Sequence, residues 1–155
     1  MTPPEPALAD RLAIEELIYL YAFTSDSQDF ERMRTLFLTD AWAVVRDTVS
    51  GQEQVIKGSE SIAAFVQQRH TAEFARGDRR RHLTSNFILD SCDGVSATAH
   101  SYVCVLQSVP GQPMQLASMG HYEDHCRKEG GHWRFQKRLL TIEGKGSIPA
   151  HSTAS

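Results

Sequence analysis

The stretch SCDGVSATAHSYVCVLQSVPGQP, residues 91–113, decides the fold class because it contains a long strand between two turns. Its Asp-Gly dipeptide at 93–94 is a strong hairpin signal, and the PGQP sequence at its end marks a second turn. Between them, residues 95–109 alternate in polarity, as a half-buried strand does. A long strand between two tight turns predicts an antiparallel sheet of consecutive strands.

The same pattern continues on both sides of that strand. Residues 85–91 are strand-like, residues 114–127 form another alternating segment, and a KEGG turn leads into a last strand at 132–142. The second half of the chain is therefore predicted to be a four-stranded antiparallel meander.

The first half has helical periodicity instead. The predicted helices cover residues 7–27, 30–37 and 59–75, and a short hairpin is expected at 39–47 and 54–57. Asp29 and Ser59 stand where the N-caps of the second and third helices would lie. Helices grouped on one side of an antiparallel sheet give an α+β fold. We expect a cone-shaped, curved sheet wrapped around the three N-terminal helices, with one open end as a ligand pocket.

Composition favours a single globular domain over residues 1–155, because 41% of the residues are hydrophobic and 23% are charged. The proline-rich residues 1–6 and the unpatterned residues 144–155 are expected to be flexible. A net charge of -3 excludes the basic surface of a nucleic-acid-binding protein and a polybasic membrane patch.

The three cysteines are widely spaced and form no CxxC pair, so they predict neither a zinc site nor a disulfide framework. Free thiols fit a reducing compartment. The N-terminus lacks the features of a signal peptide, and no apolar run is long enough to span a membrane. We therefore expect a cytoplasmic protein.

Asp26 and His82 are the main candidates for chemistry. Asp26 follows the apolar face of the first helix, at the end where the helix dipole opposes a negative charge, so its carboxylate needs a partner. His82 opens the meander, directly after the run Arg79 to Arg81. An imidazole exchanges protons near neutrality, and a carboxylate that orients its ring makes it a better base.

Plainer interpretations of these residues remain open. Asp26 can be a helix-end residue bonded to nearby backbone, and His82 is one of seven histidines. The arginine run is typical of a solvated loop, in which Arg81 would attract an anionic substrate.

Strand alternation places His100 and His121 on the outer face of the sheet if Val103 and Gly120 face inward. The remaining histidines are expected at the surface or in the tail: His70, His125, His132 and His151. The sequence has no P-loop, nucleophile elbow, dinucleotide fingerprint or helical metal-binding pair. No metal and no organic cofactor are expected.

The order of elements, the residues around Asp26, RHLTSNFILD at 81–90 and GGHWRFQKRLLTIEG at 130–144 together resemble the SnoaL-like branch of the nuclear-transport-factor-2-like superfamily. The resemblance covers residues 8–143, and the nearest patterns are those of scytalone dehydratase and hexachlorocyclohexane dehydrochlorinase. It implies that Asp26 and His82 are catalytic and that Arg138 lines the active site. Trp42 matches an aromatic position of the family. The second histidine of the dehydratase has no counterpart that can be placed, and its tyrosine before the aspartate is Ser25 here.

The resemblance implies a cofactor-free lyase or isomerase of the dehydratase, cyclase or dehydrohalogenase type. His82 would be the general base, Asp26 would orient it, and Arg138, Tyr122 or Ser101 would stabilise negative charge. The substrate would be small and hydrophobic, such as a polyketide or terpenoid. The predicted substrate-binding residues are Tyr21, Trp42, Val44, Phe65, Ser101, Val103, Gly120, Tyr122 and Leu140.

Two alternatives follow from the same resemblance. One is a non-catalytic ligand-binding or scaffold subunit, like the β-subunits of ring-hydroxylating dioxygenases. The other is epoxide hydrolysis by an Asp-Arg-Asp group, for which Asp26 and Arg138 are available but no second aspartate is clearly inside. The apolar outer face at Tyr102, Cys104 and Leu106 predicts a homo-oligomer, either a trimer or a dimer.

Overall fold

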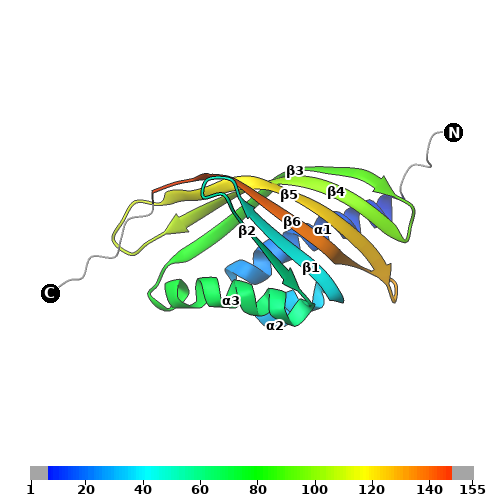
Figure 1. Ribbon diagram of the computed structural model, residues 1–155, viewed down its shortest axis with the longest axis horizontal. Coiled ribbons are helices and arrows are strands. Elements are labelled where there is room, and N and C mark those ends of the chain that lie inside the picture. The colour runs from blue at the N-terminus through cyan, green and yellow to red at the C-terminus, as the bar shows by residue number, and fades with distance from the viewer. Residues whose placement is uncertain (1–6, 148–155) are drawn as a thin grey trace.

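The computed structural model describes residues 7–147 and has the predicted α+β architecture (Figure 1). Its elements are α1 (Leu8–Asp26), α2 (Phe30–Thr35), β1 (Phe37–Asp47), β2 (Gln52–Lys57), α3 (Ser59–Ala75), β3 (Arg79–Cys92), β4 (Ser96–Ser108), β5 (Gln115–Glu129) and β6 (His132–Lys145). The sheet curves over the three helices, which lie on its concave side (Figure 1).

The six strands are ordered β2-β1-β6-β5-β4-β3 in one sheet. The meander from β3 to β6 is antiparallel throughout, as predicted. The early hairpin extends the same sheet, because β1 pairs with β6 in parallel. The sheet does not close into a barrel, so β2 and β3 are its edges.

Most element boundaries follow the sequence pattern, with three corrections. Asp29 caps α2 by accepting a hydrogen bond from the backbone N–H of Arg32 at 3.1 Å, but α2 ends at Thr35 rather than at Phe37. The cap position of α3 is Gly58, not Ser59, and no side chain caps it. β3 starts at Arg79, where a loop was expected, because residues 79–85 pair with β4.

The predicted flexible tail starts too early. Gly144 and Lys145 belong to β6, and the backbone N–H of Gly146 donates to the carbonyl of Ala117 at 2.9 Å. The rest of the two segments expected to be flexible, residues 1–6 and 148–155, lies outside the described residues.

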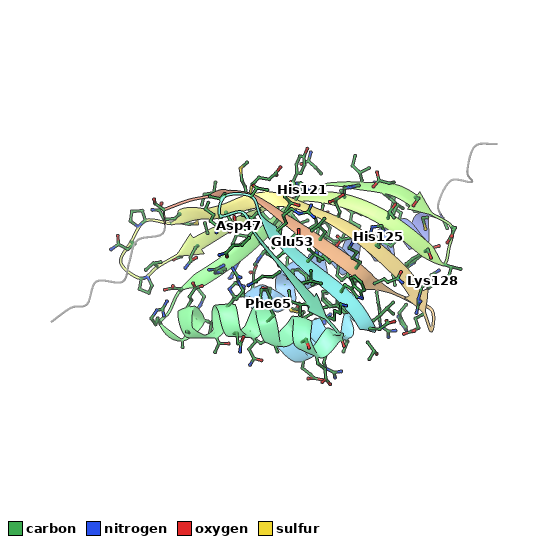
Figure 2. All side chains as sticks on the ribbon, in the orientation of Figure 1. Asp47, Glu53, Phe65, His121, His125 and Lys128 are labelled. Carbon is green, nitrogen blue, oxygen red and sulfur yellow. The ribbon has the colours of Figure 1, made fainter. Side chains whose placement is uncertain are left out.

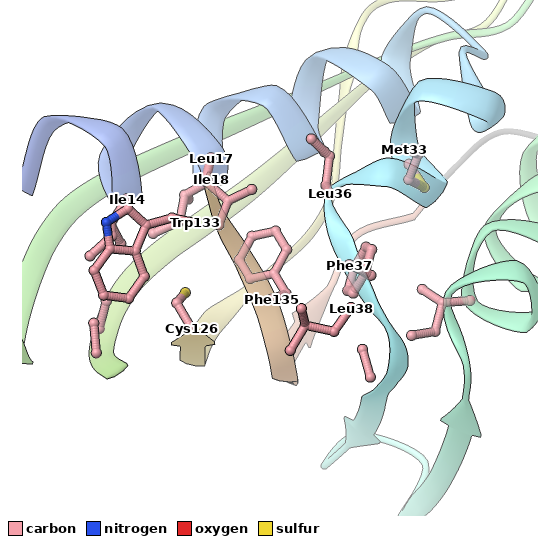
Figure 3. Packing of buried hydrophobic residues seen from close by; sticks show 14 of the residues in the cluster. Ile14, Leu17, Ile18, Met33, Leu36, Phe37, Leu38, Cys126, Trp133 and Phe135 are labelled. Carbon is pink, nitrogen blue, oxygen red and sulfur yellow. The ribbon is translucent and has the colours of Figure 1, made fainter. Parts of the chain in front are cut away.

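The main core lies between α1 and the sheet. Leu17 and Ile18 of α1 pack with Trp133 and Phe135 of β6 (Figure 3). Each side chain of this kind contributes about 1.5–3 kcal/mol when it is fully buried. A smaller cluster of Val103, Val105 and Tyr122 lies further along the same face.

Helix α1 packs mainly against the edge strand β3. At its N-terminal end, Asp10 accepts a hydrogen bond from the indole N–H of Trp133 at 2.8 Å and pairs with Lys128 at 2.6 Å. These contacts fix the direction of α1 and bring its C-terminal residue beside the start of β3. No helix within residues 7–147 is both long and apolar enough to cross a bilayer.

Candidate active site at the free edge of the sheet

The structure brings Asp26 and His82 into direct contact. Nδ1 of His82 lies 2.7 Å from Oδ1 of Asp26, and the backbone N–H of His82 donates to Oδ2 at 2.9 Å. The two side chains are only 11% and 10% exposed, respectively. With Nδ1 donating to the carboxylate, Nε2 of the neutral ring carries the free lone pair. This arrangement suits a general base.

Local backbone geometry explains why these two residues meet. In an antiparallel ladder, backbone N–H groups point alternately toward and away from the neighbouring strand. His82 pairs with Val105 of β4, but its own N–H points to Asp26 and therefore to the free edge of the sheet. The helix dipole opposes a carboxylate at the end of α1, and two hydrogen bonds from one residue compensate for it.

A cavity of about 440 Å³ touches this pair. It is lined by Tyr19, Ala22, Phe23, Asp26, Ser27, Arg81, His82, Leu83 and Thr84. Successive residues of β3 point to opposite faces of a sheet, so one cavity can touch all of them only by lying around the free edge. The expected pocket was the interior of the cone; this cavity instead opens between α1 and the edge of β3.

A second cavity, of about 10 Å³, lies on the other side of Asp26 and has room for about one water molecule. His70 lines it together with Glu73 and Arg80. The expectation that His70 lies at the surface was wrong, because its side chain is 13% exposed. Its spacing from Ile62 and Val66 on the buried face of α3 is the signal that could have placed it inside.

The Nδ1 atom of His70 is buried and has no hydrogen-bond partner within residues 7–147. Burial lowers the pKa of His70 to about 3, and electrostatic interactions with Arg80, His82 and Arg69 act in the same direction. His70 is therefore a neutral imidazole close to His82. It differs from His82 in having no carboxylate at hydrogen-bonding distance.

Arg138 lies in the interior of the sheet, away from the edge cavity. It is 3% exposed, and its guanidinium carbon lies 3.6 Å from the ring centroid of Tyr122 and 4.2 Å from that of Tyr21. Its Nε is 3.3 Å from Oδ1 of Asp124. Arg138 thus forms an ion pair behind a layer of aromatic rings.

Asp124 is the second interior aspartate that sequence reasoning did not find. It is 1% exposed, and burial raises its pKa to about 6, although the charge of Arg138 opposes this shift. Its position two residues after Tyr122 on β5 was the available signal, because both side chains must share one face.

Several buried polar atoms in this interior have no hydrogen-bond partner among the described residues. They are Oγ of Ser101, both carboxylate oxygens of Asp124 and all three guanidinium nitrogens of Arg138. The ring of Tyr122 stacks on Arg138 of this group at 3.6 Å. Burial raises the pKa of Tyr122, and the charges of Asp124 and Asp26 add to that effect while Arg138 opposes it.

The structure brings some of the predicted substrate-binding residues together. Tyr21 and Leu140 pack against the cluster that holds Val103 and Tyr122. Ser101 and Gly120 are buried on the same strands, β4 and β5. Phe65 packs at the main core, under the guanidinium of Arg69. None of these residues lines the edge cavity.

Trp42 and Val44 lie elsewhere. Trp42 is 45% exposed, and the ammonium of Lys57 lies over its ring at 4.6 Å. Alternation places Val44 on that same outer face, because Ala43 between them pairs with the inward-facing Arg138, but Val44 is only 7% exposed there. Phe37, Ala41 and Ala43 occupy odd positions of β1 and pack at the core, so alternation directs the even positions Trp42 and Val44 to the other face.

The outward facing of His100 and His121 is confirmed. The ring of His100 pairs with Asp90 at the surface, and His121 lies 3.2 Å from Glu143. Figure 2 shows His121 and His125 along β5. His125 and His132 are exposed as expected, and His151 lies outside the described residues. No cluster of three or more His, Cys, Asp or Glu residues suited to a metal occurs in residues 7–147.

Comparison with known proteins finds one matching domain family. The sequence profile of the SnoaL-like domain matches residues 6–139. None of the curated protein sequences is similar enough to be a match.

Solved structures share the fold. A nuclear-transport-factor-2-like protein with a cystatin-like fold from Novosphingobium aromaticivorans is 28% identical, covers 87% of this chain and 82% of its own, and superposes with a TM-score of 0.74. A provisionally assigned scytalone dehydratase from the same organism has 20% identity, 93% and 91% coverage and a TM-score of 0.76. The β subunit of a provisionally assigned aromatic-ring-hydroxylating dioxygenase from that organism has 19% identity, 94% coverage of both chains and a TM-score of 0.69.

Proposed function

Because the chain belongs to the SnoaL-like domain family, we propose that it is a cofactor-free lyase or isomerase that acts on a small hydrophobic substrate. The reaction would be of the dehydratase, cyclase or dehydrohalogenase type, with a polyketide or terpenoid as the class of substrate. The observation that carries this proposal is the contact between Nδ1 of His82 and Oδ1 of Asp26 at 2.7 Å, beside an apolar cavity.

In the proposed mechanism, Nε2 of His82 removes a proton from an acidic carbon of the substrate. Asp26 holds the ring through Nδ1 and stabilises the imidazolium that forms. If a leaving group departs, the electron pair of the broken C–H bond becomes a double bond and the reaction is an elimination. If the same proton returns at another carbon, the reaction is an isomerisation.

Arg138 is proposed to act at a distance. Its cation stacks on the ring of Tyr122 at 3.6 Å, and Tyr122 in turn lies near the charge of Asp26. A fixed cation behind the site favours negative charge that develops in front of it, because the intervening rings exclude water.

Single replacements of the two paired residues test the proposal. His82→Ala and Asp26→Asn should each lower turnover by about 10²–10⁴, the range that general-base catalysis supplies. Steady-state rates would be measured on hydrophobic ketones and halides. The exposed His125→Asn variant is the matched control and should keep the wild-type rate. Unchanged turnover in His82→Ala would remove the mechanism.

A non-catalytic ligand-binding or scaffold subunit is the alternative, because the same fold occurs in the dioxygenase β subunit described above. A scaffold needs no tuned imidazole. The pKa of His82 measured by NMR titration separates the two functions: a value displaced by Asp26 and altered in Asp26→Asn supports the enzyme, whereas equal solvent-like values in both proteins support the scaffold.

Epoxide hydrolysis is a second candidate, because Asp124 lies 3.3 Å from Arg138. A carboxylate next to a guanidinium can hold and activate a water molecule. This reaction would depend on Asp124 and not on His82. Hydrolysis of a cyclic epoxide that is lost in Asp124→Asn but retained in His82→Ala would favour it.

We further propose that copies of the chain associate through the outer face of the sheet, as a trimer or a dimer. Tyr102 and Met119 are 59% and 48% exposed on that face, more apolar surface than a free sheet usually presents. The free thiols of Cys92, Cys104 and Cys126 support a reducing, cytoplasmic location.

A further inference from the structure

The three consecutive arginines that precede His82 are engaged differently. Arg79 donates to the carbonyl oxygens of Phe74 and Asp78 at 3.2 and 2.7 Å, and its cation lies 4.1 Å from the ring centroid of Phe74. Arg80 binds the carboxylate of Glu73 through two nitrogens, at 2.9 and 2.7 Å. Both cations are therefore satisfied within the protein.

Arg81, like Arg79, has no carboxylate partner within residues 7–147, but it makes fewer contacts than Arg79. The guanidinium of Arg81 donates to the carbonyl oxygen of Arg80 at 2.6 Å. It also lines the cavity beside His82. The other charged group there, Asp26, is already bound by His82. The cavity therefore presents one uncompensated positive charge.

The walls of the cavity are apolar and open. Phe23 and Leu83 are 71% and 53% exposed, and the Tyr19 ring stands beside them with its hydroxyl donating to Glu15 at 2.7 Å. These side chains offer flat hydrophobic surface with no partner inside the protein. A ring-containing ligand would cover them and remove this surface from water.

The free strand edge adds a second donor. The backbone N–H of His82 points toward the edge, and in a regular antiparallel ladder the N–H two residues further along points the same way. That residue is Thr84, which pairs in register with Val103 and lines the cavity. An amide N–H and a guanidinium thus face one apolar space.

We propose that the edge cavity binds a hydrophobic carboxylate, with its ring against Tyr19, Phe23 and Leu83 and its carboxylate on Arg81. This inference rests on the proposed function in one respect only, namely that the bound ligand is the substrate class presented to His82. A charge-assisted hydrogen bond of this kind contributes more to binding than a neutral one.

Binding of two matched probes to the full chain tests this site without any turnover. Isothermal titration calorimetry would compare 2-naphthoate with its neutral analogue 2-naphthamide. The wild-type protein should bind the carboxylate about tenfold more tightly, as expected for a hydrogen bond to a charged group. Arg81→Gln should lower the affinity for the carboxylate to that for the amide, and Arg81→Lys should retain part of the preference.

Two further variants serve as controls for the charge and for the apolar wall of the cavity. Arg79→Gln removes an equal charge from the same run and should keep the preference, whereas Phe23→Ala should weaken both probes alike. Circular dichroism would verify that each variant is folded. Equal affinities of the wild type for the two probes, an unchanged preference in Arg81→Gln or a loss in Arg79→Gln would overturn the proposal. A His82 variant that is inactive but still binds 2-naphthoate more tightly than 2-naphthamide would show that ligand binding at Arg81 does not depend on the outcome of the catalytic test.

Discussion

Two buried titratable residues respond to acid in opposite directions. Burial lowers the pKa of His70 to about 3 and raises that of Asp124 to about 6. Stability rises with pH wherever the unfolded chain binds more protons than the folded one. For His70 this holds between pH 3 and about 6.5, so its burial costs stability as pH falls. For Asp124 the folded state binds the extra proton, so at this residue a fall in pH favours the folded state over the unfolded one.

Replacement of His70 should therefore reduce sensitivity to acid. As pH falls from about 6.5 to 4, wild-type protein should lose stability relative to His70→Asn by up to about 1.4 kcal/mol per pH unit, because one proton is excluded from the folded state. Urea unfolding at several pH values measures this difference. The exposed His125→Asn variant is the control for the loss of an imidazole at the surface. A difference between His70→Asn and wild type that does not depend on pH would contradict the assignment.

The elements show which predictions local patterns can support. Turn signals and alternation located the meander of β3 to β6, and helical periodicity located α1 and α3, because these patterns reflect burial on one face. The predicted facing was wrong on β1, where the core-packed residues Phe37, Ala41 and Ala43 occupy odd positions and Trp42 and Val44 therefore lie on the opposite face. Parallel pairing of β1 with β6 is a long-range contact without a local signal.

The same limits apply to the site. Asp26 and His82 were predicted as candidates because each ends or begins an element, and the structure brings them to 2.7 Å. The edge cavity was not predicted, since its walls come from both faces of β3 and from the outer side of α1. No periodicity marks a cavity that lies around a strand edge.

Gly120 fixes how closely β5 and β6 approach each other. A Cβ atom at this position would lie 2.0 Å from the carbonyl oxygen of Thr141, so the backbone would have to move. Gly120→Ala should lower the free energy of unfolding by about 1–3 kcal/mol, as overpacking does. The control is Gly144→Ala, whose Cβ would meet only the flexible Met119 side chain at 3.2 Å. Urea denaturation curves compare them, and equal losses would contradict this explanation.

At the scale of the whole molecule, the proposed association of copies of the chain depends on the outer face of the sheet. Tyr102 and Met119 border a groove of about 490 Å³ on that face, and Cys104 pairs in register with Met119. A second copy of the chain would cover this surface. The helices occupy the concave side, so the proposed association would take place on the opposite side of the sheet (Figure 1).

Light scattering after gel filtration tests association. The wild-type protein should have a multiple of the 17.3 kDa chain mass, and Met119→Glu should reduce it to the mass of one chain, because a charge cannot be buried there without a partner. Leu12→Glu changes an exposed residue on α1, away from the outer face, and should leave the assembly intact. A wild-type monomer, or an assembly that persists in Met119→Glu, would contradict the predicted interface.

The hydrogen bond from the His82 backbone to Asp26 has a consequence beyond chemistry. An unpaired strand border is a template on which another chain can add itself, which is the first step of aggregation. The Asp26 carboxylate accepts a hydrogen bond from one of the backbone N–H groups at this border, and α1 lies alongside. Asparagine at this position retains an oxygen for that N–H, whereas alanine leaves it vacant. The residue in contact with the imidazole therefore also blocks one position at which a further strand could pair with β3.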